Sequence, residues 1–399
     1  MVRMKWVTTI SRKTPFEEAV LECSEGVARD LGPGPLSLVL AFVTPHFANY
    51  YPQLYRLVSS YLEPEVFLGC SGGGVIGGSE EVEHAPAITL IAARLPDVRL
   101  RPFRADGPLP DLDGPPDAWE LLVGVRAQEE PHFVLLADPF SVRAEALLAG
   151  LDYAFPGSSK IGGLASGGAS PGLNALFLDD ELSSDGAVGL TLSGNIALDT
   201  IVAQGCRPVG DLMQITGCHG NLLYELDGRP ALEALQELFT ALDERDRHLA
   251  RTALFVGVLM DEYREEPSVG DFLIRNLIGI DPRRGAVAVG EYLQEGMRLR
   301  FHLRDAETSA EDLHAMLSAY GKTQPDAESP SGALLFSCLG RGEGLYGRPN
   351  VDTTVFRELL GDVPIGGFFC NGEIGPVGDT TFLHGYTSSF GLFRPRILA

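Results

Sequence analysis

Three glycine-rich stretches recur along this chain of 399 residues, and they constrain its fold more than any other feature. Each follows or includes apolar residues: Leu68–Gly74, Ile161–Gly168 and Ile365–Pro376. Glycine allows positive φ angles and the close approach of another backbone or a ligand, whereas Phe368 and Phe369 still carry apolar surface. A plain solvent loop would not need these aromatic side chains, so the pattern predicts one local structure that is used repeatedly.

The predicted elements around each stretch follow one order: helix, strand, helix, strand running into the glycine turn, and strand. The central strands are short apolar runs at Leu36–Val43, Phe133–Ala137 and Ala333–Ser337. Residues 231–305 form a candidate fourth copy, with a helix expected over Phe272–Ile278, but its turn has lost the glycine cluster. The repeat length exceeds that of solenoid proteins, which indicates duplication at the level of domains.

The length and the repeat together predict the fold class. A chain of this size exceeds what one hydrophobic core usually holds, so two domains are expected. We predict an α/β protein of two related modules, residues 1–205 and 206–399, with mixed sheets covered by helices. The boundary falls where Gln204–Asp211 interrupts a predicted strand pair.

Composition excludes several classes of partner. The formal net charge of −23 disfavours nucleic acid and anionic membranes, because both would be repelled. No apolar run approaches the ~20 residues of a membrane span. The six cysteines are scattered, without a Cys-x-x-Cys pair or a secretory leader, which indicates free thiols in a reducing cytoplasm. No metal-ligand spacing, P-loop or dinucleotide fingerprint occurs, so we expect no metal and no cofactor.

Several short motifs resemble one known family. They are Gly69-Cys70-Ser71 with Gly74, Gly162-Gly163, Asp227-Gly228 with Pro230-Ala231, Cys338 with Gly340-Arg341, and Gly367-Phe368 followed by Gly372-Glu373-Ile374-Gly375-Pro376. In these residues the chain resembles the FIST sensory domain, with its N- and C-terminal modules, over nearly its whole length. The resemblance implies a module that binds small ligands, with amino acids as one candidate class, and passes a signal on. Because no output domain is attached here, a signalling partner in trans or homo-oligomerisation would have to transmit it.

Two charged residues in the last repeat are candidate ligand contacts. Glu373 lies in a glycine turn between apolar residues, where a carboxylate is costly to bury alone, and could take an ammonium group. Arg341 follows a strand end and is suited to a bidentate grip on a carboxylate. Asn371 and Gly372 could add hydrogen-bond donors. The alternative is a structural ion pair between Arg341 and Glu373.

The first and last turns also contain thiols. Cys70 and Cys370, with Ser71 and Gly72 beside the former, invite a nucleophile hypothesis. No Cys/His motif supports it, and free cysteine is commonly buried, so we favour a packing role. A serine–lysine centre built from Ser71, Ser166 and Lys160 has no supporting spacing.

The sequence therefore favours a cytoplasmic sensory protein that binds a small ligand without catalysis. Two alternatives stay open: a transferase or hydrolase with a cysteine or serine nucleophile, and a protein-interaction scaffold in which the glycine turns only permit close packing. In each case the repeat predicts that the glycine turns of the two modules lie together in space.

Overall fold

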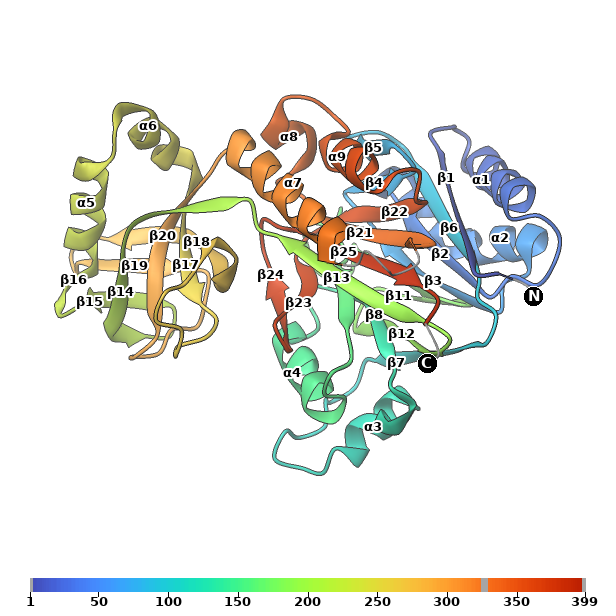
Figure 1. The fold of residues 1–399 in the computed structure, drawn as a ribbon, viewed down its shortest axis with the longest axis horizontal. Coiled ribbons are helices and arrows are strands. Elements are labelled where there is room, and N and C mark those ends of the chain that lie inside the picture. The colour runs from blue at the N-terminus through green and yellow to red at the C-terminus, as the bar shows by residue number, and fades with distance from the viewer. Residues whose placement is uncertain (1–2, 324–328, 397–399) are drawn as a thin grey trace. The chain divides into compact units, whose positions relative to one another are not determined.

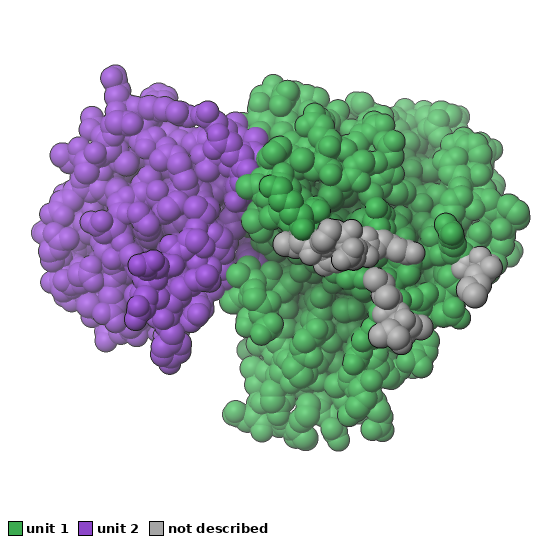
Figure 2. All heavy atoms as spheres, viewed as in Figure 1, with its two compact units in different colours: residues 1–202, 314–383, 387–399 green, residues 203–313, 384–386 purple. Residues whose placement is uncertain are grey.

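The computed structural model describes residues 3–323 and 329–396. The chain divides into two compact units, which are coloured separately in Figure 2. Unit 1 consists of residues 1–202, 314–383 and 387–399, and unit 2 consists of residues 203–313 and 384–386. The described residues form an α/β structure with mixed sheets, as the sequence predicts.

Unit 1 contains three copies of one folding unit (Figure 1). Each copy has two parallel strands joined through a helix, then a β-hairpin, then a returning antiparallel strand. Copy 1 comprises β2 (Leu38–Val43), α2 (Leu54–Leu62), β3 (Val66–Ser71), β4 (Gly74–Gly77), β5 (Glu80–Glu83) and β6 (Ile88–Arg94). Copy 2 comprises β8 (His132–Ala137), α4 (Ala144–Ala154), β9 (Lys160–Leu164), β10 (Leu176–Leu178), β11 (Glu181–Ser183) and β12 (Ala187–Gly194). Copy 3 comprises β21 (Gly332–Cys338), α9 (Val351–Leu360), β22 (Ile365–Cys370), β23 (Glu373–Val377), β24 (Thr380–His384) and β25 (Ser388–Arg394).

A strand and a helix precede the parallel pair in each copy. They are β1 (Lys5–Ser11) and α1 (Phe16–Leu31) in copy 1, β7 (Val98–Ala105) and α3 (Asp117–Val123) in copy 2, and β13 (Ala197–Ala203) and α7 (Ala306–Thr323) in copy 3. In copies 1 and 2 the helix follows its strand within a short distance along the chain. In copy 3 residues 204–305, which make up most of unit 2, lie between them.

Each copy completes its sheet with a hairpin from another copy. The β4–β5 hairpin of copy 1 pairs with β22 of copy 3, β10 of copy 2 pairs with β3 of copy 1, and β23 of copy 3 pairs with β9 of copy 2. The three six-stranded sheets therefore share one order: β1-β6-β2-β3-β10-β11, β7-β12-β8-β9-β23-β24 and β13-β25-β21-β22-β4-β5. This cyclic exchange gives unit 1 an approximate threefold organisation and ties residues from both halves of the chain together.

The central strands form because they are apolar on both faces. All six residues of β2 are buried, as are all six of β3 and of β22. Such continuous apolar runs are typical of parallel strands that are covered on both sides. One cover is the amphipathic helix α1, whose buried residues recur at helical spacing and pack with those of α2 in one apolar cluster.

Unit 2 is a small antiparallel structure. Its strands are β14 (Cys206–His219), β15 (Leu222–Leu226), β16 (Arg229–Pro230), β17 (Leu254–Leu259), β18 (Phe272–Asp281), β19 (Ala286–Val289) and β20 (Arg298–Arg304), with helices α5 (Ala231–Ala241) and α6 (Glu244–Ala253). Because β14 pairs with β20 and also with β15, the ladder closes into a barrel around an apolar core.

Two expectations about this region need correction. The predicted helix over Phe272–Ile278 is strand β18, where Phe272 and Ile274 are buried and the more exposed residue between them points to the other face. Residues 231–305 are therefore not a fourth copy of the repeat.

The compact units also divide the chain differently from the predicted modules 1–205 and 206–399. The expected boundary, between residues 205 and 206, lies near the start of unit 2 at Ala203, but residues 314–383 return to unit 1. The physical reason is the hairpin exchange, which pairs β22 and β23 with strands from the first half of the chain.

Candidate functional site

The three glycine turns lie together in unit 1, as the repeat predicts. Gly69, Gly162 and Gly367 hold equivalent positions in β3, β9 and β22. A Cβ atom added at these glycines would lie 2.0, 1.8 and 1.8 Å from a carbonyl oxygen of the neighbouring parallel strand. Real Cβ atoms do not approach an oxygen so closely. Each copy therefore requires glycine at this position of its second strand, which runs parallel to the first.

Backbone hydrogen bonds join the turns just beyond these glycines. The amide of Ser166 donates to the carbonyl of Ser71 at 3.1 Å, which links copy 2 to copy 1. The amide of Asn371 donates to the carbonyl of Leu164 at 3.1 Å, which links copy 3 to copy 2 in the equivalent way. We call the three joined turns, Ser71–Gly74, Leu164–Gly168 and Cys370–Gly372, the hub.

The third link of the hub runs through a side chain. The amide of Gly73 donates to the Ser166 hydroxyl at 2.8 Å, and that hydroxyl donates in turn to the carbonyl of Phe369. The Ser166 side chain is buried, so this bridge is shielded from water. Ser166 thus connects all three copies, although the sequence offers no motif that singles it out.

A cleft of about 350 Å³ opens beside the hub. It is lined by Phe140, Ser166, Gly167, Gly168, Ala169, Leu339 and Asn371. Phe140 and Leu339 are each 43% exposed and form its apolar walls, and Asn371 is exposed as well. Among the described residues that line this hub cleft, none is charged. The cleft lies beyond the carboxyl ends of parallel strands, where open α/β sheets usually bind ligands.

Of the predicted site residues, Asn371 lines the hub cleft and Gly372 belongs to the adjoining turn. Gly72 lies in the first turn, where its amide donates to the carbonyl of Val43 at 3.0 Å. Ser71 is buried, and its hydroxyl accepts a hydrogen bond from the amide of Ala175 at 3.0 Å.

Arg341 is fully buried and bound by a residue that the sequence analysis missed. Its Nε and Nη2 atoms each donate to a carboxylate oxygen of Asp352 at 3.0 Å, and Nη2 also donates to the Tyr346 hydroxyl at 2.5 Å. Asp352 stands in the first turn of α9, and Arg341 caps the short helix α8 (Gly342–Tyr346). Burial alone would raise the pKa of Asp352, but the guanidinium and the hydroxyl donors of Ser388 and Tyr346 more than offset it and lower that pKa.

Glu373 is also fully buried, at the start of β23. Its carboxylate accepts hydrogen bonds from the amide and the hydroxyl of Thr387, at 3.1 and 2.9 Å. Neither Glu373 nor Arg341 lines the hub cleft, and they are not each other's partners. Arg341 and Glu373 therefore each have contacts of their own, with Asp352 and with Thr387, in place of the alternative Arg341–Glu373 ion pair. Their common pocket for a zwitterion stays a prediction.

The turn thiols are packed inside unit 1. Cys70 and Cys370 are fully buried, and burial raises the pKa of both thiols well above the usual value. The Cys370 thiol donates to the carbonyl of Phe368 at 3.5 Å and occupies the space that a side chain at Gly163 would need. These surroundings oppose thiolate formation and fit the packing interpretation.

The serine–lysine centre is not assembled. The Lys160 ammonium is buried, where it pairs with Asp152 at 2.9 Å and donates to the carbonyls of Phe155 and Ser158. Burial lowers the pKa of Lys160, but its ammonium N–H groups are directed to these partners. The Ser166 hydroxyl donates to the carbonyl of Phe369 in the hub and not to Lys160.

Within the described residues, no group of three or more His, Cys, Asp or Glu side chains could hold a metal ion. The same residues contain no helix with the length and apolar character needed to cross a membrane.

The sequence analysis missed the cleft walls Phe140 and Leu339. A signal was present, since Phe140 and Leu339 follow the central strands of copies 2 and 3 by a few residues, at the strand ends where ligand contacts are expected.

Comparison with known proteins places this architecture in one family. The chain belongs to the FIST family: the FIST N domain matches residues 37–229 and the FIST C domain matches residues 231–376. It is 33% identical over 386 residues to the uncharacterized protein Rv0628c of Mycobacterium tuberculosis, which covers 96% of this chain and 98% of that protein. It is 28% identical over 184 residues to the F-box/LRR-repeat protein At5g63520 of Arabidopsis thaliana, covering 41% of this chain and 34% of that protein.

Among solved structures, the chain is similar to cyanuric acid hydrolase from A. caulinodans. The TM-score is 0.37 with 9% sequence identity, over 98% of this chain and 99% of that one.

Proposed function

We propose that this protein is a sensor that binds a small ligand in the hub cleft and has no catalytic activity of its own. FIST domains are associated with sensory and signal-transduction roles. The observation that carries the proposal is the position of the cleft, because its lining residues Ser166 and Asn371 also make the hydrogen bonds that join the copies.

The lining of the cleft suggests the chemistry of the ligand. Phe140 and Leu339 would contact an apolar group, while the Asn371 amide and the backbone of Gly167 and Gly168 would serve hydrogen-bonding groups. Since no lining residue among those described is charged, a small neutral or zwitterionic molecule suits the cleft better than a strongly charged one. Amino acids with apolar side chains are the first class to test, together with their uncharged amides.

The same contacts suggest how binding could be sensed. A ligand that touches Ser166 and Asn371 at once would stabilise the junction between copies 2 and 3, and with it the bridge to Gly73. A signalling partner in trans, or a second copy of the chain in the cytoplasm, could bind the more rigid junction differently and so transmit the signal.

The experiment is a ligand screen on the purified protein with two readouts. Native mass spectrometry would detect a small molecule retained from expression, and thermal melts would follow the melting temperature with the panel of amino acids and amides. Binding at 100 times Kd should stabilise the protein by about 2.7 kcal/mol, which is easily seen as a shift in the melting temperature.

Variants locate the binding. Ala169→Trp fills the exposed part of the cleft and should abolish the ligand-dependent shift, and Asn371→Ala should weaken binding about tenfold. Ala118→Trp, at an exposed alanine in α3, is the matched control and should bind as the wild type does. Equal binding by Ala169→Trp would overturn the location, and a covalent adduct on Cys70 or Cys370 would overturn the absence of catalysis.

A further inference from the structure

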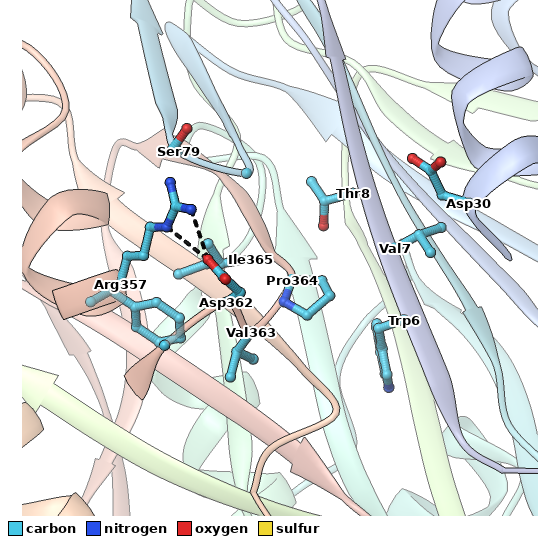
Figure 3. A pocket seen from close by; sticks show the side chains of 13 residues that line it. Trp6, Val7, Thr8, Asp30, Ser79, Arg357, Asp362, Val363, Pro364 and Ile365 are labelled. Atoms are coloured by element: carbon cyan, nitrogen blue, oxygen red, sulfur yellow. Dashed lines mark hydrogen bonds and ion pairs between the residues drawn. The ribbon is translucent and has the colours of Figure 1, made fainter. Parts of the chain in front are cut away.

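A second cavity of unit 1, away from the hub, lies beside the first strand (Figure 3). Its volume is about 350 Å³. One wall is Trp6–Thr8 of β1 together with Asp30 near the end of α1. The other wall is the segment Gly361–Ile365 between α9 and β22, and the β4–β5 turn at Ser79 also lines it. We call this cavity the edge groove.

The edge groove faces the backbone of β1 rather than one of its side-chain faces. Successive side chains of a strand point to opposite faces, so a cavity that touches the three consecutive residues Trp6–Thr8 must run along the strand edge. β1 is the end strand of its sheet and pairs antiparallel with β6. In such a pair, alternate residues direct their N–H and C=O groups away from the partner, and here those groups face the groove.

The opposite wall adds apolar contact without competing for these backbone groups. Val363, Pro364 and Ile365 are apolar, and Pro364 has no N–H to donate. An extended segment lying in the groove would therefore find hydrogen bonds on the β1 side and an apolar surface on the other. This is the arrangement by which a peptide adds a strand to an open sheet edge.

The rim of the groove selects the charge of such a segment. Asp30 and the Arg357–Asp362 ion pair lie on opposite sides of the groove in Figure 3. Each carboxylate already pairs with an arginine, Asp30 with Arg29 and Asp362 with Arg357. Their side chains are 46% and 83% exposed, so a basic residue of the segment would share the carboxylate with that arginine or displace it. The net charge of −23 would also draw a basic segment in and repel an acidic one.

We propose that the edge groove binds a short, extended, basic peptide segment, which adds to β1 as a further strand. The bound segment would place alternate apolar side chains against Val363 and Pro364 and the intervening basic ones at the rim, near Asp30 and Asp362. The site uses no residue of the hub cleft, so the proposal stands independently of the small ligand. A partner protein with an exposed basic tail is the occupant that this chemistry fits.

The first test separates strand addition from attraction by charge alone. The probe is a blocked, fluorescently labelled hexapeptide of alternating lysine and valine, titrated against the full chain by fluorescence anisotropy. Two further versions carry N-methyl groups either on every lysine amide or on every valine amide. Since only alternate N–H groups of an added strand face β1, one version should lose affinity by about tenfold or more, and the other should bind nearly as the parent does.

Two sets of variants test where the peptide binds and whether the carboxylates at the rim attract it. Ser79→Trp, at an exposed turn residue that lines the groove, should abolish binding, whereas Asp379→Trp in the corresponding turn of the β23–β24 hairpin should not. Asp30→Asn and Asp362→Asn should each weaken binding by about two- to fivefold, the range for exposed charges, and Asp211→Asn should leave it unchanged.

Three outcomes would overturn the proposal. Equal affinity of both N-methylated peptides would exclude strand addition, and equal affinity of a glutamate–valine hexapeptide would exclude the charge selection. The third is a dimer of the protein alone, seen by sedimentation and dissociated by Ser79→Trp but not by Asp379→Trp, which would make a second copy the occupant of the groove.

Discussion

Replacing Arg341 should destabilise the fold of unit 1 strongly, whether or not a ligand is present. Arg341 and Asp352 are 0% and 1% exposed. Asp352 accepts two hydrogen bonds from the guanidinium at 3.0 Å, and three more from Ser337, Tyr346 and Ser388 at 3.1, 3.0 and 2.6 Å. The pair ties the start of α9 to β21 and β25, so it contributes to the core of copy 3.

The magnitude follows from what each change leaves buried. Removing one partner of a buried ion pair typically costs about 3–5 kcal/mol, because the other charge is left without compensation. For Arg341→Met we expect the lower end, about 3 kcal/mol, since three hydroxyl donors still serve Asp352. For Asp352→Leu we expect the upper end, about 5 kcal/mol, since Nη1 of Arg341 already has no hydrogen-bond partner among the described residues.

The double variant Arg341→Met/Asp352→Leu separates the pair from its parts. It removes both charges and leaves apolar groups, so its loss should be much smaller than the sum of the single losses. Urea unfolding followed by circular dichroism measures the free energy of unfolding for each protein. Arg357→Met, which removes half of an ion pair whose partner Asp362 is 83% exposed, is the control and should change stability by less than about 1 kcal/mol.

One result would refute this reasoning. If Arg341→Met unfolds within about 1 kcal/mol of the wild type but no longer responds to the amino-acid panel, the guanidinium serves a ligand and Asp352 only holds it in place. Additive losses in the double variant would also contradict a coupled pair.

Three further predictions concern the same unit. The double variant Cys70→Ser/Cys370→Ser should keep the fold and any ligand binding, with a loss of about 1 kcal/mol per site in urea unfolding, and selective loss of turnover on an ester or amide substrate would contradict it. Burial and a neighbouring carboxylate raise the pKa of Glu81 from 4.5 to about 7, so the folded state keeps a proton that the unfolded chain releases in this window. Stability should therefore fall as pH rises from 4.5 to 7, by up to about 1.4 kcal/mol per pH unit from this group, and Glu81→Gln should flatten that slope in unfolding curves at stepped pH. Gly367→Ala should prevent folding or cost more than about 3 kcal/mol, because its Cβ would lie 1.8 Å from a backbone oxygen, whereas Gly344→Ala, with open space around it, should be neutral or stabilising in a thermal melt.

The repeat and the meeting of its turns could be predicted because both are local properties of the sequence. A glycine that must lie against a neighbouring backbone leaves the same mark in each copy, as at Gly69, Gly162 and Gly367. The apolar runs before them are long enough to identify as strands without knowledge of their partners. The α/β class and the position of Asn371 beside a cleft follow from these local signals.

The assignment of hairpins to sheets could not be predicted in this way. Nothing in the sequence of Gly74–Glu83 says that it pairs with β22 rather than with β3, since either edge would accept the same alternating residues. The choice depends on how three copies fit together, which is a property of the whole unit. The compact units divide the chain differently from the two predicted modules for that reason.

The contacts of the buried charged residues could not be predicted from the sequence either. Glu373 and Arg341 lie in the same repeat and are opposite in sign, so the sequence suggests that they act as a pair. In the structure the guanidinium binds Asp352, at the start of a helix, and Thr387 offers Glu373 both an amide and a hydroxyl. Their contacts depend on how α9 and β25 pack on β21, and no motif encodes that.

The insertion of unit 2 interrupts only the last copy of the repeat. Copies 1 and 2 run from end strand to final strand without interruption, whereas copy 3 begins at β13 and resumes at α7 after the barrel. The three sheets nevertheless keep one strand order, so the insertion enters a connection that the sheet does not use for pairing. The copies differ, however, at one of the three junctions between their turns. The Ser166 hydroxyl supplies the link between Gly73 and Phe369 that direct backbone bonds supply at the other two junctions, and it lies beside the cleft for which we propose a ligand.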